Sequence, residues 1–175
     1  MDIDFSKVKI DRLSRVYDVS KFECKDGDLN DFIRNDAFTY QEKKLATTTL
    51  FIYNDEIIGF FSASSDSLKL KYEEKKNHNI HEKKIQEFPA IKIARLARDT
   101  KYAELGLGAN ILRIAIGYIL ECSDMVAVRF VTVDAYPDKV GFYEKFGFVR
   151  NEDRHYTKKE FHVSMRYDLF NGIPK

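Results

Sequence analysis

The sequence has 175 residues, 44% of them hydrophobic, and its 29 Lys and Arg residues nearly balance 28 Asp and Glu residues. This length and composition predict one globular α/β domain with a buried core, and the net charge of +1 gives no general case for a nucleic-acid-binding or membrane-binding protein. No apolar run is long enough to span a membrane, and the acidic N-terminus does not resemble a signal peptide.

The two cysteines, Cys24 and Cys122, stand far apart without the spacing of a disulfide framework. We therefore expect reduced thiols in a cytoplasmic protein. His78 and His81 are three residues apart, but neither cysteines nor carboxylates are placed around them as the ligands of a zinc site would be. The sequence predicts no metal site.

The first half of the chain begins with a predicted strand and a predicted helix. Phe5–Leu13 carries apolar residues in loose alternation, which is typical of a half-buried strand. Asp28 suits the N-cap of a helix that continues to about Lys44, because its short side chain can accept hydrogen bonds from free backbone amides. The apolar residues of this segment recur on one face, which predicts packing against the core.

A predicted β-hairpin follows. Thr47–Tyr53 is rich in β-branched and aromatic residues, and Ile57–Ser64 returns as its partner after a short polar turn. Gly59 lies inside the second strand, which predicts a bulge or the close approach of another group.

The segment Ser67–Gln86 mixes lysines with glutamates and has the least ordered pattern in the chain. We expect a solvated, mobile helix or loop here. The alternative is a lysine-rich lip that contacts an RNA substrate through its phosphates, with Lys75, Lys76, Lys83 and Lys84 as the contacts. The interleaved glutamates weaken that alternative.

The middle of the chain predicts a strand, a glycine-rich turn and a helix. Phe88–Ala97 is mostly apolar apart from Lys92 and Arg95, and the helix follows at Asn110–Leu120. A helix that begins on glycines directs unpaired amides and the positive end of its dipole toward one place, which suits a phosphate. The alternative is that the glycines only let the helix pack closely on the sheet.

The last third predicts two more strands and a short helix. Arg129–Ala135 reads as a strand and Pro137–Phe146 as a helix. Asp153–Tyr156 is predicted as a loop, and Phe161–Tyr167 as the final strand, which pairs beside a strand that begins at Phe148.

Three motifs in this order resemble the GNAT family of acetyl-CoA-dependent N-acetyltransferases. They are Ala94–Asp99, the Gly106-Leu-Gly108 turn, and Phe142–Phe148. Phe22–Phe32 and Ile57–Ala63 also look like the branch of the family that includes toxins of toxin–antitoxin pairs. The resemblance implies a single N-acetyltransferase domain over residues 1–175, with a mixed, mostly antiparallel central sheet, a splayed parallel strand pair and flanking helices.

The resemblance also implies where acetyl-CoA, the cosubstrate, binds. The backbone of Leu96, Ala97 and Arg98 would hold the acetyl and pantetheine arm. The pyrophosphate would lie on a loop formed by Ala103, Glu104, Leu105, Gly106, Leu107, Gly108 and Ala109. In this family the position of Ala103 usually carries Gln or Arg, so a polar side-chain contact is missing, and Glu104 adds a negative charge near the pyrophosphate.

Tyr143 is the implied catalytic residue, because similar enzymes place a tyrosine general acid near the sulfur in this motif. A phenol with an ordinary pKa of about 10 is protonated at neutral pH and can donate to a leaving thiolate. The alternative is an aromatic core residue that contacts CoA without proton transfer. Phe142 is the neighbouring cofactor contact and also a packing residue. For the general base, Glu104, Asp99 and Asp134 are candidates by type alone, and a chain of waters could replace them.

The resemblance therefore implies acetyl transfer to a primary amine. The toxin-like branch favours the α-amino group of an aminoacyl-tRNA as the acceptor. A small-molecule, peptide or protein amine remains the alternative acceptor, and a non-catalytic acyl-CoA-binding protein the alternative class. An antitoxin protein and a second copy of the chain, forming a homodimer, are the candidate protein partners.

Overall fold

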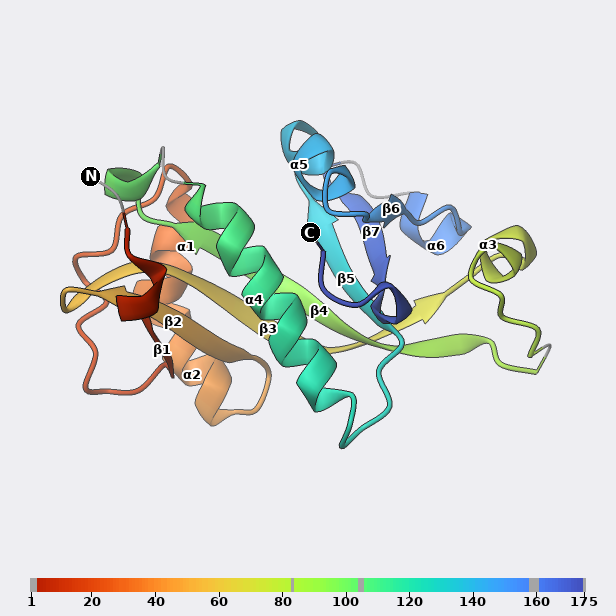
Figure 1. Cartoon of the computed structure of the whole chain (residues 1–175), viewed down its shortest axis with the longest axis horizontal. Coiled ribbons are helices and arrows are strands. Elements are labelled where there is room, and N and C mark those ends of the chain that lie inside the picture. The colour runs from red at the N-terminus through yellow and green to blue at the C-terminus, as the bar shows by residue number, and fades with distance from the viewer. Residues whose placement is uncertain (1–2, 83, 104–105, 158–160, 175) are drawn as a thin grey trace. The chain divides into compact units, whose positions relative to one another are not determined.

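Residues 3–82, 84–103, 106–157 and 161–174 are described by a computed structural model. The chain forms two compact units, each assembled from two segments. Unit 1 comprises Met1–Ser64 and Ile93–Ala115, and unit 2 comprises Ser65–Lys92 and Ile116–Lys175. The long strands β3 and β4 contribute residues to both units (Figure 1).

The strands form a seven-stranded sheet in the order β1-β2-β3-β4-β5-β7-β6. Their bounds are β1 (Lys9–Arg12), β2 (Thr47–Tyr53), β3 (Glu56–Lys69), β4 (Glu87–Arg98), β5 (Phe130–Ala135), β6 (Val149–Arg150) and β7 (Val163–Asp168). The pairs β1–β2, β2–β3, β5–β7 and β6–β7 are antiparallel, whereas β4 and β5 are parallel. This confirms the mixed, mostly antiparallel sheet with one parallel pair.

The parallel ladder between β4 and β5 is short. It begins at Ala90↔Phe130 and ends at Lys92↔Thr132, although β4 continues to Arg98 and β5 to Ala135. The backbone of β4 beyond Lys92 therefore has no register partner on β5.

The helices of the described residues have the following bounds: α1 (Gly27–Asp31), α2 (Ala37–Glu42), α3 (Tyr72–Asn77), α4 (Leu107–Cys122), α5 (Val140–Glu144) and α6 (Arg154–Thr157). A π-helical turn, Phe32–Asp36, joins α1 to α2. Short 3-10 turns occupy Phe5–Lys7, Thr100–Tyr102, Pro137–Lys139 and Leu169–Asn171.

Two predicted boundaries near the N-terminus are wrong. The helix predicted to begin at Asp28 is capped by Asp26, whose carboxylate accepts hydrogen bonds from the amides of Asp28 and Leu29 at 2.9 and 3.3 Å. The strand predicted over Phe5–Leu13 is a 3-10 turn followed by the shorter β1. Asp4 causes this difference, since its side chain caps the turn by accepting from the Ser6 amide at 3.1 Å.

The loop predicted at Asp153–Tyr156 is instead helix α6. Asp153 accepts a hydrogen bond from the amide of His155 at 2.9 Å, and its carbonyl accepts from Tyr156 at the same distance. In both regions, an aspartate side chain that bonds the local backbone decides the structure, and hydrophobic periodicity does not report such bonds.

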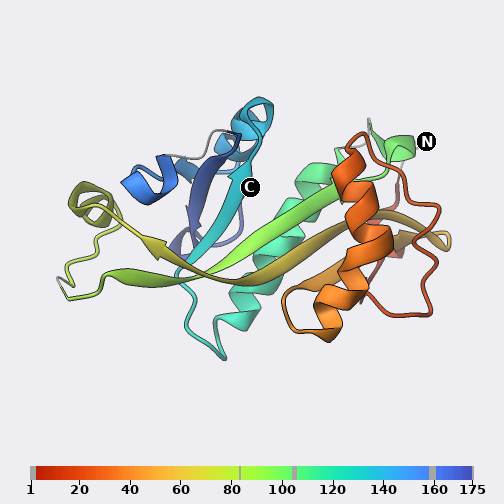
Figure 2. The ribbon, with the colours of Figure 1, turned by 180° about the vertical axis from the view of Figure 1, so that it is seen from behind.

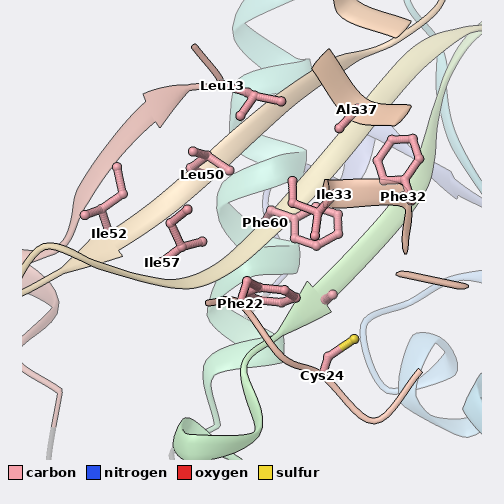
Figure 3. Close-up of a cluster of buried hydrophobic side chains, with 11 residues drawn as sticks. Leu13, Phe22, Cys24, Phe32, Ile33, Ala37, Leu50, Ile52, Ile57 and Phe60 are labelled. Atoms are coloured by element: carbon pink, nitrogen blue, oxygen red, sulfur yellow. The ribbon is translucent and has the colours of Figure 1, made fainter. Parts of the chain in front are cut away.

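In unit 1, α1 and α2 cover one face of the strands, and the first part of α4 covers the other (Figures 1 and 2). The helical face predicted from the sequence packs into the core, where the Phe60 ring lies 5.3 Å from Phe22 and 6.2 Å from Phe32 (Figure 3). Leu50, Ile33 and Ala37 belong to the same buried cluster (Figure 3).

At Gly59, atoms of α4 and β4 lie very close to the backbone of β3. A Cβ at this position would stand 2.4 Å from the Ile111 Cδ1 atom of α4 and 3.0 Å from the Ala97 carbonyl oxygen of β4. The register between β2 and β3 also shifts beside it, between Phe51 and Ile52. Both structural features predicted for a glycine inside this strand, a bulge and a close approach, are confirmed.

In unit 2, a buried network of charges anchors α3 to β7. Arg166 donates to Glu74 at 2.6 Å and to Asn151 at 2.9 Å, and its Nε lies 2.9 Å from His78 Nε2. The other ring nitrogen of His78 lies 2.8 Å from Asp168. The expectation of a mobile, solvated segment at Ser67–Gln86 is therefore wrong at its centre, because Glu74 is only 2% exposed and is paired.

The same network holds Asp168 in its charged form. Burial raises the pKa of Asp168, but hydrogen bonds from His78 and Arg129 outweigh burial, and the pKa lies below its ordinary value. His78 is therefore committed to structural contacts within unit 2.

We predict that Glu74→Ala lowers the free energy of unfolding by about 3 kcal/mol, because it leaves the buried Arg166 guanidinium without its carboxylate. Urea unfolding followed by circular dichroism measures the change. The neighbouring Glu73 is exposed, so Glu73→Ala is a matched control that should change stability by less than about 0.5 kcal/mol. Equal effects of the two substitutions would contradict the anchoring role of Glu74.

Candidate active site

The glycine-rich turn leads into α4 in unit 1. Gly106 has a φ of +63°, a conformation that residues with a Cβ rarely adopt, and its carbonyl accepts from the Ala109 amide at 3.0 Å. Leu107 is fully buried and fixes the first turn of the helix, while Gly108 and Ala109 are half-buried. The first amides of such a helix have no intrahelical partner, so this end can accept an anion.

The residues before the turn come from the end of β4. Leu96 and Arg98 are half-buried, and Ala97 is part of the core of unit 1. Ala103 closes a 3-10 turn, with its amide 3.2 Å from the Thr100 carbonyl. Glu104 and Leu105, which were predicted to complete the loop, lie outside the described residues.

Asp99 links these two segments. It is 2% exposed, and its carboxylate accepts hydrogen bonds from the amides of Glu23 at 3.0 Å and Lys101 at 2.8 Å. Its own amide donates to the Ile58 carbonyl at 2.9 Å. Asp99 therefore holds the turn between β4 and α4, and both carboxylate oxygens are committed to this task. The sequence suggested Asp99 only as a candidate general base, although an aspartate directly before a short turn commonly caps that turn.

Tyr143 lies on α5 in unit 2, within a group of aromatic rings. Its ring centroid is 5.2 Å from that of Phe142 and 5.4 Å from that of Phe148. The side chain is half-buried, and its hydroxyl makes no hydrogen bond to any residue that the structure describes. Burial raises the pKa of Tyr143 to about 12. The phenol is thus protonated throughout the neutral range and keeps its donor available for a ligand.

A second charged group occurs in unit 2 at the end of the β4–β5 ladder. The Lys92 ammonium lies 3.0 Å from Asp134 and 3.8 Å from Asp66, and the Thr132 hydroxyl donates to Asp66 at 2.5 Å. The sequence suggested Asp134 as a candidate general base by residue type alone, and it did not indicate Asp66 or Lys92 as site residues. The available signal was Lys92 itself, a charged residue inside an otherwise apolar strand.

A cavity of about 570 Å³ lies in unit 1 between the segment after β1 and the π-helical turn with α2. Ile33, Phe38 and Val19 give it an apolar lining, with Arg15 and Arg34 among the polar residues. None of the predicted site residues lines it. Among the described residues, no group of three or more His, Cys, Asp or Glu side chains is placed to hold a metal ion, and no helix has the length and apolar character to cross a membrane.

A profile of the family described as "Acetyltransferase (GNAT) domain" matches residues 23–169. The chain belongs to the GNAT acetyltransferase family. The match covers the end of β4, the start of α4 and the α5 segment, so the family's N-acetyltransferase activity is assigned to the part of the chain that carries all the predicted site residues.

Toxins are prominent among the proteins similar to this GNAT acetyltransferase. A curated tRNA-acetylating toxin of Mycobacterium tuberculosis is 27% identical over 138 residues, which cover 78% of this chain and 81% of that protein. A structure of a tyrosine-to-phenylalanine mutant of KacT has a TM-score of 0.80 at 17% identity, and the match covers 94% of this chain and 96% of that one.

Two structures of AtaT show the same fold. AtaT complexed with acetyl-methionyl-tRNAfMet has a TM-score of 0.80 at 19% identity, with 94% of this chain and 96% of that one covered. A tyrosine-to-phenylalanine mutant of AtaT, bound to the C-terminus of the antitoxin AtaR and to acetyl-CoA, has a TM-score of 0.74 at 19% identity, with 94% and 95% covered. The resemblance to toxin acetyltransferases predicted from the sequence is confirmed.

Proposed function

We propose that this acetyltransferase transfers the acetyl group of acetyl-CoA to the α-amino group of an aminoacyl-tRNA, in the manner of a toxin. The observation that carries the proposal is the similarity, over 78% of the chain, to a curated tRNA-acetylating toxin. The fold likeness to AtaT, solved with an acetylated aminoacyl-tRNA, supports it. Residues 1–175 would act as one acetyltransferase domain in the cytoplasm, where charged tRNA is found.

The proposal includes protein partners. An antitoxin is proposed because AtaT has been solved with the C-terminus of its antitoxin AtaR. A second copy of the chain stays a candidate partner. A small-molecule, peptide or protein amine is the alternative acceptor. The net charge of +1 favours this alternative, because the chain as a whole has little electrostatic attraction for RNA, and tRNA binding would need a locally basic surface.

Acetyl-CoA is the proposed donor, and two features of unit 1 support a place for it. The backbone of Leu96, Ala97 and Arg98 continues beyond the end of the β4–β5 ladder, so its polar groups can pair with the pantetheine arm as an added strand would. The amides of Gly106, Leu107 and Gly108 can receive the pyrophosphate at the start of α4, next to Ala109, whose amide bonds the Gly106 carbonyl. In unit 2, Phe142 is the proposed aromatic contact of the cofactor.

Acetyl transfer requires a neutral amine, a polarised thioester carbonyl and a stabilised thiolate. The amine nitrogen forms a bond to the carbonyl carbon, and the C–S bond breaks with its electron pair on sulfur. A backbone amide of β4 aimed at the carbonyl oxygen would stabilise the negative charge that develops there. The thiolate takes a proton as it leaves, and the nitrogen loses one, so protons balance.

Tyr143 is the proposed donor to the thiolate. Its pKa of about 12 lies above the ordinary thiol pKa of about 8.5, so complete transfer to a free thiolate is unfavourable by itself. The hydroxyl therefore keeps its proton and donates a hydrogen bond that strengthens as charge develops on sulfur, and the thiolate finally takes up the proton that the nitrogen loses.

The first prediction concerns acetyl-CoA binding. Calorimetry should detect micromolar affinity, or about 8 kcal/mol. Gly108→Val should weaken binding at least about tenfold, because a branched side chain at the start of α4 blocks the approach of the pyrophosphate to the backbone. Gly27→Val is the control, since nothing lies within 4 Å of a Cβ at Gly27. Unchanged binding by a folded Gly108→Val protein would show that the loop assignment is wrong.

The second prediction concerns Tyr143→Phe, which keeps the ring and removes only the hydroxyl. We expect kcat to fall at least about tenfold with little change in acetyl-CoA affinity, because the hydrogen bond matters mainly in the transition state. Wild-type activity should show no loss from Tyr143 ionisation below about pH 10, since burial raises its pKa to about 12. Tyr72→Phe, at an exposed position on α3, is the control. An unchanged chemical step would exclude Tyr143 as the donor.

The third prediction tests the acceptor. Labelled acetyl groups should pass from acetyl-CoA to aminoacylated tRNA and not to deacylated tRNA, and tRNA affinity should fall steeply as salt rises. Charge reversal of the exposed Lys76 and Lys84 should weaken tRNA binding and lower the salt slope by about 1 to 2. Lys75 is unsuitable, because its ammonium already donates to the Ile85 carbonyl at 2.7 Å, and Lys83 lies outside the described residues.

Lys7→Glu, on a 3-10 turn of unit 1, is the control for charge reversal. No transfer to aminoacylated tRNA, with transfer to a small or peptide amine and a flat salt response, would favour the alternative acceptor and leave the acetyltransferase assignment unchanged.

A further inference from the structure

Two arginines near the end of β4, Arg95 and Arg98, face opposite sides of the sheet in unit 1. Successive side chains of a strand point to opposite faces, so Arg95 and Ala97 share one face and Arg98 lies on the other. Contacts agree with this placement. The Arg95 guanidinium lies 5.1 Å from the Phe32 ring centroid, and Ala97 belongs to the same buried cluster as Phe32. Arg98 therefore lies on the face that the first part of α4 covers (Figures 1 and 2).

The backbone of Arg98 lies close to the start of α4. A Cβ at Gly59 would stand 3.6 Å from the Arg98 Cα atom and 2.4 Å from the Ile111 Cδ1 atom, so Gly59 is a common neighbour of both residues. Ile111 lies about one turn beyond Leu107, the first residue of α4. The Arg98 side chain thus leaves the sheet beside the end of the helix that is proposed to receive the pyrophosphate.

The Arg98 guanidinium has no acidic partner among the residues that the structure describes. Its side chain is half-buried, and neither a hydrogen bond nor an ion pair joins it to residues 3–82, 84–103, 106–157 or 161–174. Lys101, three residues further along, lies 3.3 Å from Glu56. A half-buried guanidinium has lost part of its hydration and keeps five N–H donors, so it favours an anion with several acceptor oxygens.

The loop before α4 offers an anion its backbone amides but little side-chain charge. Gly106, Leu107 and Gly108 have no polar side chain, and neither has Ala103. The end of a helix contributes about half a positive charge, which does not balance a pyrophosphate whose two phosphates are both ionised. An arginine beside the helix end would supply a full charge and paired N–H donors, which suit phosphate oxygens.

We propose that the Arg98 side chain binds the pyrophosphate of acetyl-CoA and supplies the side-chain contact that Ala103 lacks. The inference rests on the proposed use of acetyl-CoA as the donor. One residue would then serve two parts of the cofactor, because its backbone would pair with the pantetheine arm and its guanidinium would neutralise the phosphates. Arg98 is a binding residue and takes no part in proton transfer.

The test is calorimetric titration of the wild type and Arg98→Met with acetyl-CoA, without an acceptor. Methionine keeps an unbranched apolar side chain and removes the charge. Arg98→Met should weaken acetyl-CoA binding at least about tenfold, the loss expected for one charge-assisted hydrogen bond. The same loss is expected with acetyl-dephospho-CoA, which keeps the pyrophosphate and lacks the 3′-phosphate. Added salt should weaken binding by the wild type more than binding by the variant.

Arg95→Met is the matched control, because it removes an arginine from the same strand on the face that packs against Phe32. Its acetyl-CoA affinity should stay within about twofold of the wild-type value. Ala103→Arg tests rescue: added to Arg98→Met, it returns a cation to the loop before α4 and should restore most of the lost affinity. The melting temperature of each variant without ligand verifies that it is folded.

Glu104 is the acidic residue of this loop in the sequence, and it provides a second control. Arg98→Met should cause the same loss of acetyl-CoA affinity in a Glu104→Gln background, because the proposed partner of Arg98 is the pyrophosphate. Disappearance of the loss in that background would overturn the inference, since Arg98 would then only neutralise Glu104.

The other outcomes separate the inference from the proposed function. A folded Arg98→Met protein that binds acetyl-CoA like the wild type would overturn the inference and leave the donor assignment intact. An equal loss from Arg95→Met, a loss that Ala103→Arg does not reduce, or a loss absent with acetyl-dephospho-CoA would also overturn it. A wild type that does not bind acetyl-CoA would contradict the donor of the proposed function and the role of Arg98 with it.

Discussion

The parallel pairing of β4 with β5 stops after the rung Lys92↔Thr132, and the proposed chemistry depends on this stop. A strand that continues without its partner has backbone donors and acceptors to offer, and a bound molecule can take the place of the missing strand. At the last rung the Lys92 side chain is 27% exposed, whereas Thr132 is buried. Lys92, Thr132 and the neighbouring Asp134 are a polar group in a sheet whose strands are otherwise mainly apolar.

The link between β4 and α4 is fixed by the buried Asp99 carboxylate and by the backbone conformation of Gly106. Asp99 binds amides from two separate segments, and Gly106 takes a positive φ that starts the helix in a defined direction. Because Gly59 has no side chain, Ile111 of α4 and the Ala97 carbonyl of β4 can both lie close to β3. Rigid positioning of amides is what anion binding and oxyanion stabilisation require, since prearranged donors need no reorganisation during the reaction.

Unit 2 contains a buried network of charged side chains. Arg166, Glu74, His78 and Asp168 form a connected network in which each group has a partner. Burial of such pairs is costly, so their net contribution to stability is small, but an incomplete network would be strongly destabilising. The network therefore fixes one arrangement of α3 against β7.

Local signals in the sequence determined much of this structure. The β-branched run at Thr47–Tyr53, the glycine turn before α4 and the aromatic motif around Tyr143 all predicted the elements that are found, because periodicity and turn chemistry act over a few residues. Local signals failed where an aspartate bonds the backbone: Asp26 rather than Asp28 caps α1, and Asp153 turns a predicted loop into α6.

The tertiary structure alone decided which charged residues meet. Glu74 and Arg166 are 92 residues apart in the sequence, and Asp66 and Thr132 are 66 apart, so no local pattern links them. Their pairing follows from the order of strands in the sheet and from the register between β5 and β7. The sequence by itself thus determined the family and the segments that carry the chemistry. Only the fold showed that Asp99 holds a turn and that Asp134 pairs with Lys92, because burial and hydrogen-bond partners are properties of the packed chain.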